Sequence, residues 1–202
     1  MQDKNMSTEI TRQQKKELRA MLKAKRKQIA ADIKKQLDKN ICNNILNSVS
    51  YRYADVVLMF YSAEYEIDVL GVFEKALQDG KRVAFPKCVS KGVMKFYFVS
   101  TKQDFITGSY GILEPKDTCE QYNPAAAVHP LCIVPCLCAY TDGKRLGYGG
   151  GYYDRFLSSF DGISMCVQYE DFLFEQIPFD KRYDKKTDII VTEKAVYVVG
   201  KK

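Results

Sequence analysis

The stretch RLGYGGGYYD, residues 145–154, holds the groups best suited to chemistry in this sequence. Its four glycines let backbone N–H groups approach an anion closely, and Arg145 carries a fork of donors that matches phosphate oxygens. A buried-strand pattern, LCIVPC (131–136), precedes the stretch, and a helix pattern begins at Tyr152, so the positive end of that helix adds to the field. The stretch predicts a phosphate cradle; a mobile loop or a tight strand-to-helix turn is the other interpretation.

Two standard phosphate-binding loops do not fit this stretch. The Walker pattern Gly-x-x-x-x-Gly-Lys-Ser/Thr occurs nowhere in the chain. The dinucleotide fingerprint Gly-x-Gly-x-x-Gly fails because Tyr152 stands where a third glycine is needed after Gly147 and Gly149. The predicted cradle is therefore of another kind.

Strand patterns alternate with helix patterns along the chain, which favours an α/β fold with a largely parallel sheet. We predict a single domain over residues 1–202 with three layers, α/β/α, in a Rossmann-like arrangement. The glycine stretch then lies at the carboxyl edge of the sheet, where ligands bind. The predicted strands are 54–62, 81–86, 93–100, 131–136, 163–169, 188–192 and 195–199. The predicted helices are 8–29, 66–80 and 152–160, and 29–45 is either a second helix or an extension of the first; a turn is predicted at 88–92 and a loop at 110–115.

Basic residues are concentrated near the amino terminus. Residues 1–50 contain 12 Lys and Arg against 5 Asp and Glu, whereas the rest of the chain is close to neutral. Leucines and isoleucines at helical spacing predict that this segment is helical and packs on the α/β body. Its charge has three interpretations: a solvated helix face, a nucleic-acid patch, or a wall for an anionic small molecule.

The seven cysteines are odd in number and irregularly spaced, which predicts reduced thiols in a cytoplasmic protein. The amino terminus has no apolar core typical of a secretory signal, and no apolar run approaches the ~18 residues of a membrane span. Cys136 and Cys138 form one Cys-x-Cys pair without a second pair, so buried thiols are favoured over a metal site. His129, the only histidine, precedes a proline at a strand entrance, and we interpret it as structural.

The segment VPCLCAYTDGKRLGYGGGYYDRFL (134–157) resembles the signature of the 5-formyltetrahydrofolate cyclo-ligase family, also called methenyltetrahydrofolate synthetases. Cys136 and Cys138 depart from the family pattern where small residues are usual, Tyr140 replaces a phenylalanine, and Tyr148 stands where some members carry a basic residue. Further matching pieces follow in order over nearly the whole chain: KKELR (15–19), FYSAEYEID (60–68), FPK (85–87), YGILEP (110–115) and TDIIVTE (187–193).

The resemblance implies the ATP- and Mg²⁺-dependent conversion of 5-formyltetrahydrofolate to 5,10-methenyltetrahydrofolate, with release of ADP and phosphate. Phosphorylation of the formyl oxygen by ATP makes that oxygen a leaving group, and N10 of the folate then closes the ring. Such chemistry needs positioning and charge stabilisation rather than a protein nucleophile.

The family's functional positions carry over to residues of this sequence. The resemblance implies that Lys15, Arg19 and Arg145 are catalytic, with the basic helix as a lid over the nucleotide. It implies Mg²⁺ ligation by Asp154 and Asp188; from the residues alone either one is equally an ordinary helix-end or strand-end carboxylate. The implied ATP contacts are Lys15, Lys16, Arg19, Arg145, Leu146, Gly147, Tyr148, Gly149, Gly150, Gly151, Tyr152 and Tyr153. The implied folate contacts are Tyr61, Glu66, Tyr148, Gly149, Gly150, Gly151 and Tyr152; core packing is the alternative for the tyrosines.

Two other functions remain open on the residues alone. One is a phosphate-binding α/β enzyme related to sugar-phosphate isomerases or coenzyme A transferases, which would not need Mg-ATP. The other is a nucleic-acid-binding protein using the basic helix, which is disfavoured because the aromatic residues are not interleaved with the amino-terminal lysines. We expect small-molecule substrates, with the folate free to carry a polyglutamate tail, no nucleic-acid or membrane partner, and a monomer.

Overall fold

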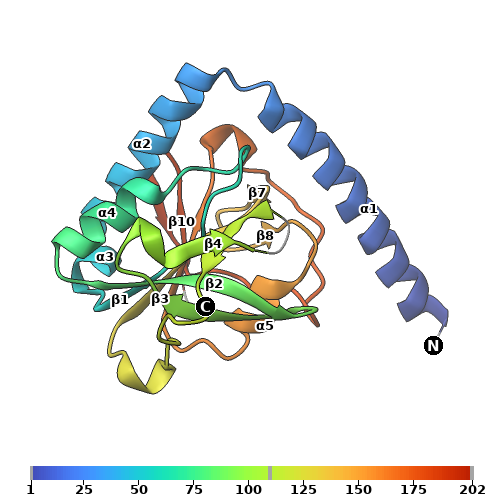
Figure 1. The fold of residues 1–202 in the computed structure, drawn as a ribbon. Helices are drawn as coiled ribbons and strands as arrows, with labels where there is room; N and C mark the ends of the chain where they lie inside the picture. Colours follow the sequence, from blue (N-terminus) through green and yellow to red (C-terminus); the bar gives the residue numbers. More distant parts are fainter. Residues whose placement is uncertain (1, 109–110, 201–202) are drawn as a thin grey trace.

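A seven-stranded sheet organises the chain in the computed structural model, which describes residues 2–108 and 111–200 (Figure 1). The strand order is β11-β10-β9-β6-β1-β2-β3. The inner strands β10, β9, β6, β1 and β2 run parallel, and β11 and β3 are antiparallel edges. The bounds are β1 Val56–Leu58, β2 Arg82–Ser90, β3 Val93–Phe98, β6 Pro130–Pro135, β9 Ile163–Val167, β10 Ile189–Val191 and β11 Val196–Val198.

Three of the parallel strands, β1, β6 and β10, are apolar along their whole length because both faces of the sheet are covered there. Every residue of β1, β6 and β10 is buried. Helices α2 (Ala31–Asn47) and α4 (Leu70–Gln78) cover one face. Helix α5 (Tyr152–Leu157) covers part of the other, and its Phe156 packs against the ring of Phe96 in β3. The predicted three-layer α/β/α architecture is confirmed (Figure 1).

The amino-terminal segment forms two helices rather than one continuous rod. Helix α1 (Gln2–Lys27) runs along one side of the molecule, and α2 begins after a break at Ala30, whose backbone is extended (Figure 1). A short helix, α3 (Val49–Tyr53), joins α2 to the sheet. The carboxyl-terminal half of α1 contacts the body, where Leu22 is fully buried.

Several predicted boundaries differ from the structure. The predicted strand 54–62 is ordered as β1 over three residues only, because the chain then leaves the sheet toward the loop that precedes α4. The predicted helix 152–160 ends at Leu157. Strand β2 extends into the predicted turn 88–92, and the chain reverses at Gly92, which has a positive φ.

The predicted loop 110–115 contains a short strand. Strand β5 (Leu113–Pro115) pairs with β4 (Phe105–Thr107) in an antiparallel ribbon beside the sheet, whereas Tyr110 lies outside the described residues. A second ribbon pairs β7 (Cys138–Ala139) with β8 (Arg145–Leu146). Single turns of 3-10 helix cover Lys102–Asp104, Pro124–Ala126 and Glu170–Phe172.

Candidate active site

A cavity of about 760 Å³ opens at the carboxyl ends of β1, β2 and β6. Phe60 and Tyr61 follow β1, Pro86 lies in β2 beyond its pairing with β1, and Pro135 ends β6. The glycine stretch 147–151 and one side of α1 complete the wall. The glycine stretch was predicted to lie at the carboxyl edge of the sheet, and this cavity lies at that edge.

The glycine stretch adopts a backbone that other residues rarely reach. Gly149 has a φ of 109° and Gly151, which begins α5, a φ of 68°. Both values lie in the left-handed region that favours glycine. The sequence pattern thus has a conformational cause: the chain must turn twice within a few residues between β8 and α5 while its backbone lines the cavity.

Arg145 is held in β8 beneath this stretch, with its side chain 2% exposed. Its Nη2 donates to Oδ1 of Asp154 at 2.9 Å, which fixes the guanidinium against the start of α5. Its buried Nε finds no hydrogen-bond partner among the described residues. A buried donor without an acceptor is costly, so the position suits an anionic ligand.

Helix α1 presents Lys15, Arg19, Leu22 and Arg26 to the body at spacings of four, three and four residues, which is one helix face. The Nε of Arg19 donates to the carbonyl oxygen of Gly147 at 2.9 Å. Burial lowers the pKa of Arg19, and the nearby carboxylates of Asp184 and Asp154 oppose that shift. The helix is thereby anchored directly to the glycine stretch.

Lys15 pairs with Asp184, a carboxylate in the segment before β10. Both side chains are mostly buried and both line the cavity. Oδ2 of Asp184 also accepts from the backbone N–H of Asp180 at 2.7 Å, which fixes the carboxylate. The Lys15 ammonium is therefore held at the cavity by a partner far away in the sequence.

A second chain of contacts runs from α1 to the opposite wall through Tyr148. The buried Arg26 donates through Nη2 to the Cys136 carbonyl oxygen at 2.6 Å and to Oε1 of Gln168 at 2.8 Å. Its Nη1 donates to the Tyr148 hydroxyl at 3.2 Å, and that hydroxyl hydrogen-bonds the carboxylate of Glu66. Tyr148, which replaces a basic residue of some family members, thus connects Arg26 with a cavity carboxylate.

Burial raises the pKa of Glu66, which is only partly offset by hydrogen bonds from the Ala63 backbone and the Tyr148 hydroxyl. Burial also raises the pKa of Tyr148, so its hydroxyl stays protonated. Next to this pair Tyr61 packs edge-on against Phe105, with ring centroids 5.2 Å apart. This wall combines a flat apolar surface with a carboxylate.

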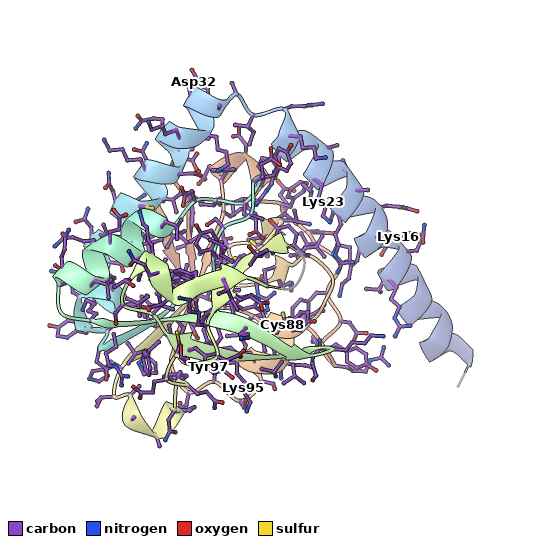
Figure 2. All side chains as sticks on the ribbon, in the orientation of Figure 1. Lys16, Lys23, Asp32, Cys88, Lys95 and Tyr97 are labelled. Carbon is purple, nitrogen blue, oxygen red and sulfur yellow. The ribbon has the colours of Figure 1, made fainter. Side chains whose placement is uncertain are left out.

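Most of the predicted site residues meet at this cavity, and two do not. Lys16 is exposed and does not line the cavity, unlike Lys23 further along α1 (Figure 2). Asp188 lies at the amino edge of the sheet, opposite the cavity. The predicted residues that line the cavity are Lys15, Arg19, Tyr61, Glu66, Arg145, Leu146, Gly147, Tyr148, Gly149, Gly150, Gly151, Tyr152, Tyr153 and Asp154.

Asp188 has a structural environment instead of the one implied by the resemblance. Its Oδ2 accepts from the Ser164 backbone N–H at 2.9 Å and from the Ser164 hydroxyl at 2.6 Å. These bonds tie the start of β10 to the start of β9, because parallel strands begin at the same edge. Asp188 and Asp154 therefore do not face one common ligand.

Sequence reasoning missed several cavity residues. Tyr183 and Asp184 precede β10 by several residues, and nothing in their local pattern distinguishes them from a solvated loop. Arg26 does not line the cavity but contacts Tyr148, which does; it continues the spacing of Lys15 and Arg19 along α1, so helical periodicity could have found it. The other missed lining residues are Lys23, Phe60, Ala63, Pro86, Cys88, Met94, Ile112, Leu113, Glu114, Pro135 and Arg155.

The interpretations of the histidine and the cysteines agree with the structure. His129 lies at the amino edge of the sheet, and its backbone N–H donates to Asp55 at 2.8 Å. Cys136 and Cys138 are buried, and all seven cysteines are free. In the part of the chain that the structure describes, no three His, Cys, Asp or Glu side chains form a group that could hold a metal ion by themselves.

Comparison with known proteins identifies the same family as the sequence motifs. The model of the 5-formyltetrahydrofolate cyclo-ligase family matches residues 11–193. A Schizosaccharomyces pombe protein named "Probable 5-formyltetrahydrofolate cyclo-ligase" is 27% identical over 197 residues, covering 90% of this chain and 96% of that protein. The Escherichia coli K12 5-formyltetrahydrofolate cyclo-ligase is 24% identical over 182 residues, covering 88% and 99%.

Solved structures give the same result for the fold. The NMR structure of Aquifex aeolicus 5,10-methenyltetrahydrofolate synthetase superposes with a TM-score of 0.80 at 27% identity, covering 93% of this chain and 94% of that one. A Mycoplasma pneumoniae 5,10-methenyltetrahydrofolate synthetase has a TM-score of 0.70 at 20% identity, covering 89% and 98%, which supports the fold alone. None of the described helices combines the length and apolar character needed to span a bilayer.

Proposed function

Because the chain belongs to the 5-formyltetrahydrofolate cyclo-ligase family, we propose that it converts 5-formyltetrahydrofolate and ATP to 5,10-methenyltetrahydrofolate, ADP and inorganic phosphate, with Mg²⁺ bound. The observation that carries this proposal is the buried Arg145 guanidinium, which keeps an unpartnered N–H among the described residues beneath a glycine-rich backbone. Phosphate oxygens are the acceptors that such a group fits best.

ATP binds in this proposal along the glycine stretch, between Arg145 and α1. Arg19 and Lys15 lie over the stretch from one side and Arg145 from the other, so charge on the transferred phosphoryl group is stabilised from two walls. Arg19 keeps donors on its guanidinium besides the Nε that binds Gly147. No nucleophile of the protein takes part.

The folate lies against the opposite wall, where Tyr61 and Tyr152 offer flat ring faces and Glu66 offers a carboxylate. The γ-phosphoryl group passes to the formyl oxygen of the substrate. The N10 lone pair then attacks the formyl carbon, the carbon–oxygen bond breaks with loss of phosphate, and N10 gives up its proton. The cavity holds N10 and the formyl carbon close together and limits the access of water to the activated formyl group.

Mg²⁺ fits the donor set of the cavity. Asp154 and Asp184 both line it, and Mg²⁺ typically takes one or two carboxylates together with waters and substrate phosphates. Asp154 accepts two hydrogen bonds in the described structure, from the Arg145 Nη2 and from the Lys185 backbone N–H. Both are accepted by Oδ1, so neither of these donors occupies Oδ2. We propose Asp154 and Asp184 as the residues that would hold Mg²⁺, which would neutralise phosphate charge when bound.

The deciding experiment mixes the protein with 5-formyltetrahydrofolate, ATP and Mg²⁺ and follows the absorbance of the methenyl product. Product formation that requires both ATP and Mg²⁺ is expected. Folded protein that forms no product would reject the proposal. Turnover of a phosphorylated substrate without Mg-ATP would favour the sugar-phosphate isomerase or coenzyme A transferase alternative.

The remaining expectations belong to the same proposal. We infer a cytoplasmic monomer of one domain that acts on small molecules and binds neither nucleic acid nor membranes. The side chains of α1 that contact the body support a role for its positive charge at the cavity rather than on a nucleic acid. Light scattering and an RNA-binding titration at physiological salt test these points.

A further inference from the structure

Besides Glu66, Asp154 and Asp184, a fourth carboxylate, that of Glu114 in β5, lies in the wall of the cavity. The residue is 7% exposed, and its Oε1 accepts from the backbone N–H of Cys88 at 3.3 Å. The Cys88 thiol donates to this carboxylate, and its sulfur accepts from the Tyr152 hydroxyl. Glu114 is therefore a buried carboxyl group that Cys88 connects to Tyr152, one of the tyrosines that bind the folate in the proposed function.

The neighbouring chain leaves space for this carboxylate. A Cβ atom at Gly108 would lie 2.3 Å from Oε2 of Glu114, far inside van der Waals contact. Gly108 does not have a positive φ, so its backbone conformation does not require glycine. Glycine fits at position 108 because the Glu114 carboxylate occupies the space that a Cβ atom would need.

Glu114 lacks a cationic partner. Among the described residues, no Lys or Arg nitrogen lies within 4 Å of its carboxylate oxygens; Lys87, near in sequence to Cys88, binds Pro115 and Asp117 instead. A buried carboxylate that meets one backbone N–H and one weak S–H donor has spare acceptor capacity, because it can accept about four hydrogen bonds. Burial without compensation is costly, so a ligand that supplies donors would offset the cost.

Building on the proposed function, we propose that Glu114 binds the pterin ring of the folate by accepting hydrogen bonds from the 2-amino group and N3–H. These two groups are adjacent donors on one edge of the ring, and a carboxylate has two oxygens at matching spacing. The ring then lies between Glu114 and Glu66. Glu66 already accepts from Ala63 and Tyr148, so fewer of its acceptor sites remain for the remaining pterin nitrogens.

The test measures folate affinity directly, without ATP, by titration calorimetry. The ligands are 5-formyltetrahydrofolate and its analogue without the 2-amino group, and the proteins are wild type, Glu114→Gln and the control Glu120→Gln, whose carboxylate is exposed. Glu114→Gln should weaken binding of the parent folate by roughly 10- to 100-fold, the range for a charged hydrogen bond left incomplete. The control should bind as wild type does, and the ATP affinity of all three proteins should agree.

The analogue separates recognition from a structural role. Wild type and the control should lose about the same factor when the 2-amino group is missing, whereas Glu114→Gln should lose much less. If all three proteins lose affinity by the same factor when the 2-amino group is missing, the inference is overturned. It is also overturned if Glu66→Gln, but not Glu114→Gln, no longer distinguishes the parent folate from the analogue. Glu114→Asp keeps the carboxylate on a side chain that is one methylene shorter, so it should also weaken folate binding. This variant replaces Glu114→Gln in the test if Glu114→Gln does not fold.

The outcomes also distinguish the inference from the proposed function. Wild-type protein that binds no folate would overturn both. Wild-type protein that binds folate and forms the methenyl product, with Glu114 variants of unchanged affinity, would overturn the inference alone.

Discussion

At the scale of single residues, Arg145 and Arg26 are both buried, yet their partners differ. Arg26 uses both terminal nitrogens on Cys136, Gln168 and Tyr148, which makes it a structural connection between α1 and the body. Among the described residues, the hydrogen-bond partner of the Arg145 side chain is Asp154. The Nε of each arginine lacks a partner among the described residues, so the two differ in their terminal nitrogens and in position: only Arg145 lines the cavity, which supports the proposed ligand role for Arg145 and a structural role for Arg26.

Arg145→Ala should lower kcat/KM by about 10²- to 10³-fold, the usual cost of removing a preorganised donor to developing charge. Arg145→Lys should recover little, because an ammonium does not reproduce the guanidinium fork. Steady-state kinetics on the methenyl product measure the effect, with the exposed Arg52→Ala as control. A near-normal kcat/KM for Arg145→Ala would contradict the phosphate role.

Glu66→Gln should stabilise the protein at neutral pH while lowering its activity. Burial raises the pKa of Glu66 in the folded state, so folding favours the protonated carboxyl. The stability it contributes is present below its ordinary pKa of about 4.5 and is lost as the pH rises through the folded-state value. Urea denaturation should show the variant more stable than wild type at pH 7, with the difference shrinking toward pH 4. A difference that does not change with pH, or that matches Glu120→Gln, would contradict this assignment.

The sequence predicted the residues of the glycine stretch and α1 because their types carry the chemistry in a local pattern. Glu114 lies within the matching piece YGILEP and Asp184 in a polar segment, but neither was recognised as a site residue, since a single Glu or Asp is normally solvated. Their importance comes from burial at the cavity, which depends on contacts far apart in the sequence. Asp188 shows the opposite case, where a motif match led to a residue that the topology carries to the other edge of the sheet.

At the scale of elements, the glycine stretch is joined to the β2–β3 hairpin by one side chain. Arg155 of α5 donates through Nη2 to the Gly150 carbonyl oxygen and through Nε to the Gly92 carbonyl oxygen at the hairpin turn. Its guanidinium lies where a Cβ atom of Gly151 or Gly92 would be. The side chain therefore fixes the stretch relative to the sheet.

Arg155→Ala should raise the KM for ATP by roughly three- to tenfold, which corresponds to losing the net free energy of about one hydrogen bond that orders the glycine stretch. The melting temperature should change little, because Arg155 is exposed and buries no apolar surface. Hydrogen exchange of residues 147–151 should become faster in the variant and stay unchanged in Arg52→Ala. An unchanged KM together with unchanged exchange would show that the carbonyl contacts do not order the stretch.

Strands that lie within longer apolar runs of the sequence could be predicted, and the short strands outside such runs could not. The apolar runs around β1, β6 and β10 predicted buried parallel strands, since only a sheet covered on both faces buries every residue. The ribbons β4–β5 and β7–β8 have strands of two or three residues, too short for any periodicity to register. Yet β8 holds Arg145 and β5 holds Glu114, so the elements hardest to predict carry two residues of the site.

At the scale of the whole molecule, ligands bind where α1 meets the body, so they should stabilise the entire chain. A ligand at 100 times its Kd adds about 2.7 kcal/mol to the free energy of unfolding. For a domain of this size that corresponds to a rise in Tm of roughly 5–10 °C. Differential scanning calorimetry with Mg-ATP should show one transition that moves upward as a unit. Two transitions, of which only one moves, would contradict the single domain proposed for residues 1–202.

Helix α1 finds its partners only late in the chain. Arg19, Arg26 and Lys15 contact residues 128, 110 and 169 positions further on. On a ribosome that adds about 5 to 20 residues per second, α1 emerges on the order of ten to thirty seconds before Asp184 is made. During synthesis the side of the helix that carries Leu22 has nothing to bury against. Helix α1 is thus among the last described segments to find its packing partners, and the nascent chain carries an exposed apolar stripe that is open to chaperones until the residues that cover it have been made.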